Sequence, residues 1–96
     1  MATVRAFSID DIETWFHSGD HEPPHFHAKR KGEWEVRVYF LRSPSEMIDI
    51  KWNKKKRRPN GLKTICSLAE ENRIQLLEQW EQVHQISNES SDKRKN

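Results

Sequence analysis

The chain has 96 residues, of which 33% are hydrophobic and 33% charged, and its formal net charge is +2. A chain of this length is expected to form one small domain, and because it lacks both a run near the roughly 20 apolar residues that cross a bilayer and an apolar signal sequence, we expect a cytoplasmic protein. Its single cysteine, Cys66, excludes an internal disulfide and is predicted to be a small buried residue.

Alternation of apolar and polar residues predicts strands in the first half of the chain. These stretches are residues 3–7, 12–17, 25–29, 33–41 and 46–52. In the third stretch Phe26 and Ala28 face the core, while His25, His27 and Lys29 share the opposite face. The apolar face of the last stretch consists of Ile48, Ile50 and Trp52.

Matching of faces predicts the turn between the stretches 25–29 and 33–41. A three-residue loop over 30–32, with Gly32 left-handed, pairs Phe26 with Val36. The other pairs in this register are Ala28 with Trp34, His27 with Glu35, His25 with Arg37 and Lys29 with Glu33. The two histidines are therefore expected on an outward, polar surface.

From Leu62 onward the apolar residues recur with the period of a helix. The first apolar stripe consists of Leu62, Ile65, Cys66 and Ala69. Asn72 and Gln75 match an N-cap residue and its N3 partner, so a break is predicted at Asn72. The apolar face of the second helical stretch consists of Ile74, Leu77 and Trp80, flanked by Leu76 and Val83.

Strands followed by helices predict an α+β fold, in which a small antiparallel sheet of about four strands is packed on one face by one or two C-terminal helices. The domain is expected to span residues 1–86, and the polar residues 87–96 to form a disordered tail. The histidines then lie on the sheet face opposite the helices.

The candidate site is the stretch 20–27, in which His21, His25 and His27 surround two prolines. His25 and His27, two residues apart on one strand, can converge on a divalent metal ion with His21 as a further ligand. Residues that could complete such a site are His17, Asp20 and Glu35. His25 and His27 are also candidate acid/base catalysts. In a third interpretation the stretch is a structural corner whose histidines contact rings and backbone.

Charge is unevenly distributed, since residues 1–27 carry a net charge of −4 and residues 28–63 one of +8. The basic segment consists of Lys54, Lys55, Lys56, Arg57 and Arg58. Mutual repulsion favours an exposed loop there, which could contact nucleic-acid phosphates, with Trp52 for stacking, or the acidic face of a partner protein. Trp15 and Tyr39 are expected near the histidines, as a base-stacking platform or a packed sheet face.

Three segments of the chain resemble the small bacterial proteins grouped as domain of unknown function 4160. They are residues 15–17, residues 20–28 with the pattern His-x-Pro-Pro-His-x-His, and residues 76–80. The similarity covers residues 3–85, and the histidine pattern is its most specific part. The resemblance implies a free-standing protein encoded beside a second small protein, as one half of a toxin–antitoxin pair. It supplies no catalytic residues, and the basic segment is longer than expected for the family.

The leading hypothesis is therefore a small bacterial interaction protein of a toxin–antitoxin-like two-gene module. It would bind a protein partner, with nucleic acid as a further partner at the basic segment and the histidine face. The alternative is a small nuclease, in which His25 and His27 are metal ligands or acid/base groups and His21 or Glu35 assists. A divalent metal is the cofactor that this alternative implies.

Overall fold

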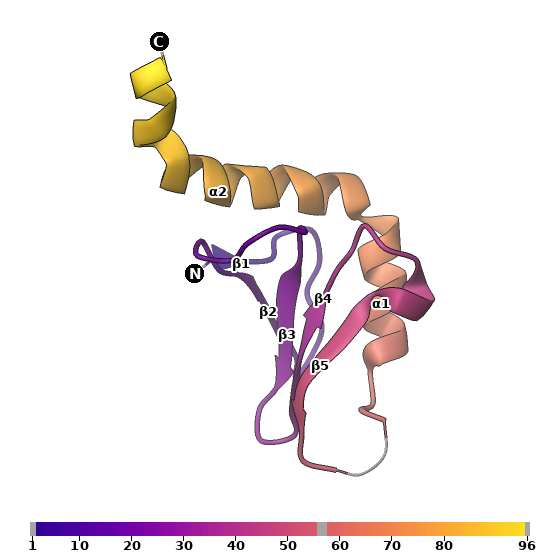
Figure 1. The fold of residues 1–96 in the computed structure, drawn as a ribbon. Coiled ribbons are helices and arrows are strands. Elements are labelled where there is room, and N and C mark those ends of the chain that lie inside the picture. Colours follow the sequence, from indigo (N-terminus) through magenta and orange to yellow (C-terminus); the bar gives the residue numbers. More distant parts are fainter. Residues whose placement is uncertain (1, 56–57, 96) are drawn as a thin grey trace.

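A computed structural model describes residues 2–55 and 58–95, with side chains described as far as residue 84. Five strands form one antiparallel sheet in the order β1-β2-β3-β4-β5, and two helices follow (Figure 1). The strands are β1 (Ala2–Thr3), β2 (Glu13–Phe16), β3 (Phe26–Arg30), β4 (Trp34–Val38) and β5 (Ile48–Asn53). The helical elements are a 3-10 turn η1 (Pro44–Glu46), α1 (Leu62–Glu71) and α2 (Arg73–Lys95). The predicted α+β fold is confirmed, with five strands where about four were expected.

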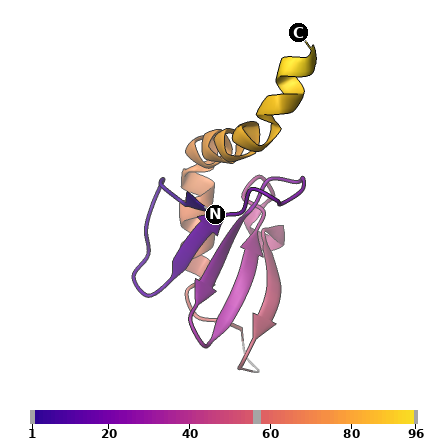
Figure 2. The ribbon, with the colours of Figure 1, turned by 90° about the vertical axis from the view of Figure 1, so that its left-hand side faces the viewer.

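The helices cover the sheet in two directions. Helix α1 packs against one face of the sheet, whereas α2 turns away from α1 and lies across the end of the sheet near β1 (Figures 1 and 2). The segment joining β2 to β3 meets α2 at this end, because the side chain of His84 contacts the backbone of Asp20. The outer face of the sheet is therefore closed at one end by a helix and open along the rest of its length.

The core lies between the sheet and the two helices and is rich in aromatic rings. Phe16 has no exposed surface, and its ring meets those of Phe26, Phe40 and Trp80 edge to face, at centroid distances of 6.2, 6.3 and 6.4 Å. Alternation in β2 places Thr14, two residues before Phe16, inward with it. Aromatic burial compensates for the low apolar content of this short chain.

The hairpin of β3 and β4 keeps the predicted faces but not the predicted partners. Phe26 pairs with Val38, so the predicted pair with Val36 was wrong by two residues. Other observed pairs are His27 with Arg37, Ala28 with Val36, and Lys29 with Glu35. A shift of two residues leaves every side chain on its own face, so alternation alone does not distinguish the two registers.

The turn of this hairpin explains the shift. The N–H of Glu33 donates to the carbonyl oxygen of Arg30 at 2.9 Å, and Arg30 pairs with Trp34, so the loop covers residues 31–33 rather than 30–32. Gly32 has a φ of +78°, which confirms its predicted left-handed conformation. It occupies the third position of the turn, where a positive φ favours glycine.

A bulge in β5 changes the face of Trp52. Val36 pairs with Ile50, but the next pair joins Glu35 to Trp52, so Lys51 is an extra residue between them. Cross-strand partners share a face, and Glu35 lies on the outer face. The prediction that Trp52 shares a face with Ile50 was therefore wrong. Trp52 lies on the outer face with Glu35 and is 40% exposed.

The helical region is interrupted at Asn72, as predicted. Asn72 was expected to be the N-cap of the second helix, but it is the C-cap of the first. Both the backbone N–H and the side-chain amide of Asn72 donate to the carbonyl oxygen of Leu68, so Asn72 closes α1 rather than opening α2. In the part of α2 whose side chains are described, the buried residues are Leu76, Gln79 and Trp80. Ile74 is 74% exposed, so its predicted place on the apolar face was wrong; α2 presents Leu76 to the core instead.

The end of α2 includes the region predicted as a tail. Helix α2 continues to Lys95, and residues 87–95 fall in its last part. Neither helix in the described part of the chain is long and apolar enough to cross a membrane.

Candidate metal centre

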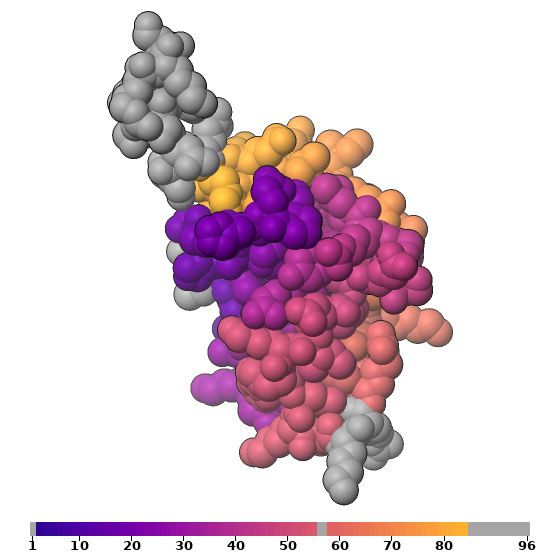
Figure 3. Space-filling model, in the orientation of Figure 1, coloured from indigo at the N-terminus to yellow at the C-terminus, as the bar shows by residue number. Residues whose placement is uncertain are grey.

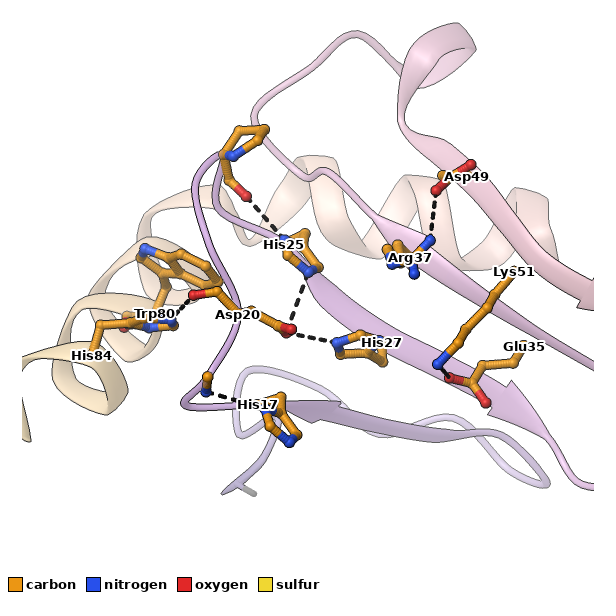
Figure 4. A network of polar contacts seen from close by, with 12 residues as sticks. His17, Asp20, His25, His27, Glu35, Arg37, Asp49, Lys51, Trp80 and His84 are labelled. Carbon is orange, nitrogen blue, oxygen red and sulfur yellow. Dashed lines mark hydrogen bonds and ion pairs between the residues drawn. The ribbon is translucent and has the colours of Figure 1, made fainter. Parts of the chain in front are cut away.

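Three side chains converge at the end of the sheet beneath α2. Asp20 lies in the segment between β2 and β3, His25 directly precedes β3, and His27 is its second residue. Figure 4 shows the carboxylate of Asp20 between the two imidazole rings. One ligand atom from each of the three residues lies within 4.8 Å of the others, a spacing at which all three could hold one metal ion.

The two histidines contact the same oxygen of Asp20. Its Oδ2 lies 2.6 Å from Nε2 of His27 and 3.2 Å from Nε2 of His25. His25 and His27 are 6% and 7% exposed, although both were expected on an outward surface. They do lie on the outer sheet face, but the segment 17–25 and α2 fold over them, which alternation within a strand does not reveal.

A contact with the backbone of Pro23 fixes the tautomer of His25 and therefore the role of the ring nitrogen that faces Asp20. Nδ1 of His25 lies 2.9 Å from the carbonyl oxygen of Pro23, which can only accept, so Nδ1 carries a proton. In the neutral ring Nε2 then presents a lone pair to the Asp20 carboxylate. Two acceptors face each other favourably only when a cation or a further proton lies between them. Metal-ligating histidines are commonly oriented by this kind of N–H to carbonyl bond.

The ring of His27 is held by packing as well as by Asp20. It stacks on Trp15 at a centroid distance of 5.3 Å and an interplanar angle of 14°. Its Nδ1 is buried and has no hydrogen-bond partner among the described residues, and its Nε2 faces Asp20. Neither ring nitrogen of His27 is free to exchange protons with a substrate in solvent, so this geometry favours a ligand role over acid/base catalysis.

Helix α2 fixes the backbone of Asp20 through His84. Nδ1 of His84 lies 2.9 Å from the carbonyl oxygen of Trp80, and Nε2 lies 2.9 Å from the carbonyl oxygen of Asp20. The His84 ring also stacks on Trp80 at 3.7 Å. Because carbonyl oxygens only accept, a doubly protonated ring satisfies both contacts. This role of His84 has no signal in the sequence, since 64 residues separate it from Asp20.

A hollow opens beside the centre on the outer face of the sheet. Its volume is about 330 Å³, and it is lined by Trp15, His17, Asp20, His27, Glu35, Arg37 and Lys51. Two ion pairs border it: Arg37 lies 2.9 Å from Asp49, and Lys51 lies 3.3 Å from Glu35. A metal ion held by Asp20 and His27 would therefore have a lined, solvent-filled space next to it.

The structure does not bring every predicted site residue into the centre. His21 is exposed, and within the described residues the group of potential ligands contains Asp20 in its place. His17 lines the hollow, and its Nδ1 accepts a hydrogen bond from the N–H of Gly19 at 3.1 Å. Asp20 was one of several residues considered to complete the site, and no pattern in the sequence selected it over His21.

The aromatic residues near the centre form a packed sheet face. Trp15 and Tyr39 are both partly buried, and the ring of Tyr39 lies 5.0 Å from that of His25. The guanidinium of Arg42 covers Tyr39 at 4.3 Å. Their role in the described structure is therefore to enclose the histidines.

The basic segment lies beyond the end of β5. Lys54, Lys55 and Arg58 are exposed, as predicted, whereas Lys56 and Arg57 lie outside the described residues. Nζ of Lys55 lies 3.8 Å from Glu33, so its contact with an acidic group is loose. The chain bends at Lys54 and Lys55, directly after β5, where the N–H of Lys55 donates to Oδ1 of Asn53 at 3.2 Å.

Cys66 lies on α1, away from the centre, and is partly buried rather than fully buried. Burial raises the pKa of its thiol, an effect that Arg58 opposes and Glu70 reinforces. A raised pKa leaves less thiolate at neutral pH, so Cys66 is a poor nucleophile.

The fold and the cluster define an α+β protein that carries a two-histidine, one-carboxylate centre on its sheet. The sequence profile of the family described as Domain of unknown function (DUF4160) matches residues 12–81, a range that contains all three cluster residues. The chain belongs to this family, as the resemblance of its motifs predicted. Searches of curated proteins and of solved structures gave no match.

Proposed function

We propose that this protein is a metal-dependent hydrolase whose metal ligands are Asp20, His25 and His27. The observation that carries the proposal is the meeting of Nε2 of His25 with Oδ2 of Asp20 at 3.2 Å, while Nδ1 of His25 is occupied by Pro23. A cation between these atoms turns an unfavourable contact between acceptors into coordination. Centres with three protein ligands keep a position for water, whereas structural zinc sites are closed by four.

The ligand types restrict the metal. Two imidazoles and one carboxylate suit zinc, ferrous iron and other first-row divalent ions, and the only thiol, Cys66, is on α1. Zinc bound by such a set can lower the pKa of a bound water to about 7 and so supply hydroxide at neutral pH. We therefore take zinc as the first ion to test, with cobalt as its spectroscopic substitute.

The test is a metal titration of untagged, chelator-treated protein by calorimetry. We expect about one equivalent of zinc to bind, and His25→Ala to weaken binding by at least about 100-fold, because losing even an outer-shell partner costs 10–100-fold. His21→Ala is the matched control, since it removes an exposed histidine of the same motif and should leave the affinity unchanged.

The absorption spectrum of the cobalt form adds a second readout, because its bands report coordination by the protein directly. Bands that appear in the wild type and in His21→Ala but not in His25→Ala support the proposal. Zinc affinity that is equal in His25→Ala and the wild type would refute it.

A second candidate function is binding of a small protein encoded beside this one, the toxin–antitoxin-like pair that the family resemblance implies. This candidate function is supported by two large apolar side chains that lie exposed: Ile74 is 74% exposed and Leu41 is 47% exposed. The two belong to adjoining segments, because Arg73 donates hydrogen bonds of 2.8 Å to the carbonyl oxygens of Phe40 and Arg42. Exposed apolar groups that cluster are typical of interaction sites.

We expect the double variant Leu41→Glu, Ile74→Glu to weaken binding of that neighbour-encoded protein by more than about 10-fold, as truncation of interface anchors does. Both residues are exposed, so the melting temperature should stay close to that of the wild type. Binding is measured by calorimetry, and Lys31→Glu on the hairpin turn serves as control. Equal affinity of the double variant and the wild type would exclude this surface.

A further inference from the structure

We propose that the hollow beside the centre binds the phosphodiester backbone of single-stranded nucleic acid as the substrate of the metal-dependent hydrolase. This inference rests on the proposed function, because the metal supplies both the reactive water and part of the charge that attracts the backbone. The proposed binding surface consists of the hollow, the outer face of β5 and the first residues of the basic segment.

The charge of the hollow depends on the metal. Its fixed charges cancel, because Asp20 and Glu35 are matched by Arg37 and Lys51. A bound divalent cation leaves the hollow with two net positive charges while the histidines stay neutral. Low-dielectric walls such as the Trp15 ring strengthen this field. Anion binding in the hollow is therefore coupled to metal binding.

The two cations are placed for a phosphate group. Arg37 lies directly opposite His27 in the register of β3 and β4, so its guanidinium is next to the centre. Its fork of donors suits phosphate oxygens. Arg37 and Lys51 now contact Asp49 and Glu35, but ion pairs at the surface are weak because water screens them, so a phosphate can replace the carboxylates.

The surface beyond the hollow fits a polymer better than a single nucleotide. Lys51 stands at the rim, Trp52 is 40% exposed, and the exposed Lys54 and Lys55 come directly after the end of β5. In Figure 3 the residues of β5 and those just after it lie at the surface in the lower half of the view. An exposed ring between cations is the pattern that binds single strands by stacking and charge.

A metal ion held by the centre would supply the attacking water, whose oxygen would form a bond to phosphorus while the bond between phosphorus and the leaving sugar oxygen breaks with its electron pair. The proton of the water passes to the carboxylate of Glu35, which lines the hollow on the other side of His27 from Asp20 (Figure 4), and then to the leaving oxygen.

The test uses a fluorescein-labelled 12-residue single-stranded RNA, and a DNA of the same sequence, with zinc-loaded and zinc-free protein. Binding is followed by fluorescence anisotropy between about 50 and 200 mM salt, and cleavage on denaturing gels. The double variant Arg37→Gln, Lys51→Gln removes the cations of the hollow. Its matched control, Lys31→Gln, Lys63→Gln, removes the same charge from exposed positions away from it. Zinc binding of every variant is measured separately by calorimetry.

We expect the zinc-loaded wild type to bind and cleave at least one of the strands, and zinc-free protein to bind much more weakly. The hollow variant should lower the slope of log K against log salt by about 1.4, because each lost contact to a single strand removes about 0.7. The control variant should keep the slope of the wild type. Inorganic phosphate and a mononucleotide at the same phosphate concentration should compete poorly.

The outcomes separate the two proposals. If zinc binds but the salt slope is the same in both double variants, or the strands bind without being cleaved, the substrate assignment is overturned and the metal centre stands. Equal competition by a mononucleotide would overturn the assignment of a polymer. If no zinc binds to the wild type, the proposed function itself fails, and the substrate assignment fails with it.

Discussion

Replacing Phe16 with alanine is expected to lower the free energy of unfolding by about 3–5 kcal/mol, the range found for loss of a buried aromatic side chain. Phe16 has no exposed surface, and its ring is the common neighbour of Phe26, Phe40 and Trp80. The cavity left by alanine would be bounded by three rigid rings, which cannot collapse into it. Since small domains are stable by about 5–15 kcal/mol, the variant should approach unfolding at room temperature.

Urea unfolding followed by circular dichroism measures this difference. Phe16→Leu keeps most of the volume and is expected to cost less than the alanine variant. Ile74→Ala, on a side chain that is 74% exposed, should change the free energy by no more than about 0.5 kcal/mol. A loss below about 1 kcal/mol for Phe16→Ala would mean that the aromatic cluster is not the centre of the core.

Alternation in the sequence was sufficient to predict this core. The inward placement of Phe16, Phe26 and Val36 follows from a period of two, which depends only on neighbouring residues. The stripe of α1 follows in the same way from a helical period, and its predicted core residues Leu62, Ile65 and Ala69 are buried. Local patterns determine which side chains share a face, because residues two apart in a strand, and three or four apart in a helix, point the same way.

Partners and irregularities were harder to predict, for identifiable reasons. The hairpin loop covers residues 31–33, closed by the hydrogen bond from Glu33 to Arg30, and alternation does not distinguish registers two residues apart. The bulge at Lys51 turns Trp52 to the outer face, although a regular strand would have placed it with Ile50. Ile74 was predicted inward because the helical period tolerates a shift of the apolar face by one residue.

The candidate site was predicted in the right stretch, but with His21 as the third ligand, whereas the structure groups Asp20 with His25 and His27. Its histidine pair, His25 and His27, lies on one face of a strand, and this much is local. The third member depends on how the segment 17–25 folds back, which α2 determines through the contact of His84 with the carbonyl oxygen of Asp20. No pairwise pattern in the sequence links these residues, so the choice between Asp20 and His21 needed the structure.

Replacing Asp20 with alanine is expected to abolish the stabilisation of the fold by zinc. At a free zinc concentration about 100 times the dissociation constant, binding to the native state adds about 2.7 kcal/mol. One kcal/mol shifts the melting temperature of a domain of this size by about 4–8 °C, so the wild type should gain about 11–22 °C. Without metal, Asp20→Ala should also cost about 1–3 kcal/mol, because it leaves the buried Nε2 of His27 without its acceptor.

Differential scanning calorimetry with and without zinc separates the two effects. Asp10→Ala removes an exposed carboxylate that is not a member of the centre, and it should melt like the wild type and gain the same increment from zinc. If Asp20→Ala still gained that increment, zinc would be bound elsewhere and the ligand assignment would be wrong. If zinc raised the melting temperature of neither the wild type nor Asp20→Ala, and Asp20→Ala was less stable than the wild type, Asp20 would serve to hold the two histidines rather than a metal ion. The contrast between these variants thus decides whether the cluster is a metal centre or a structural corner.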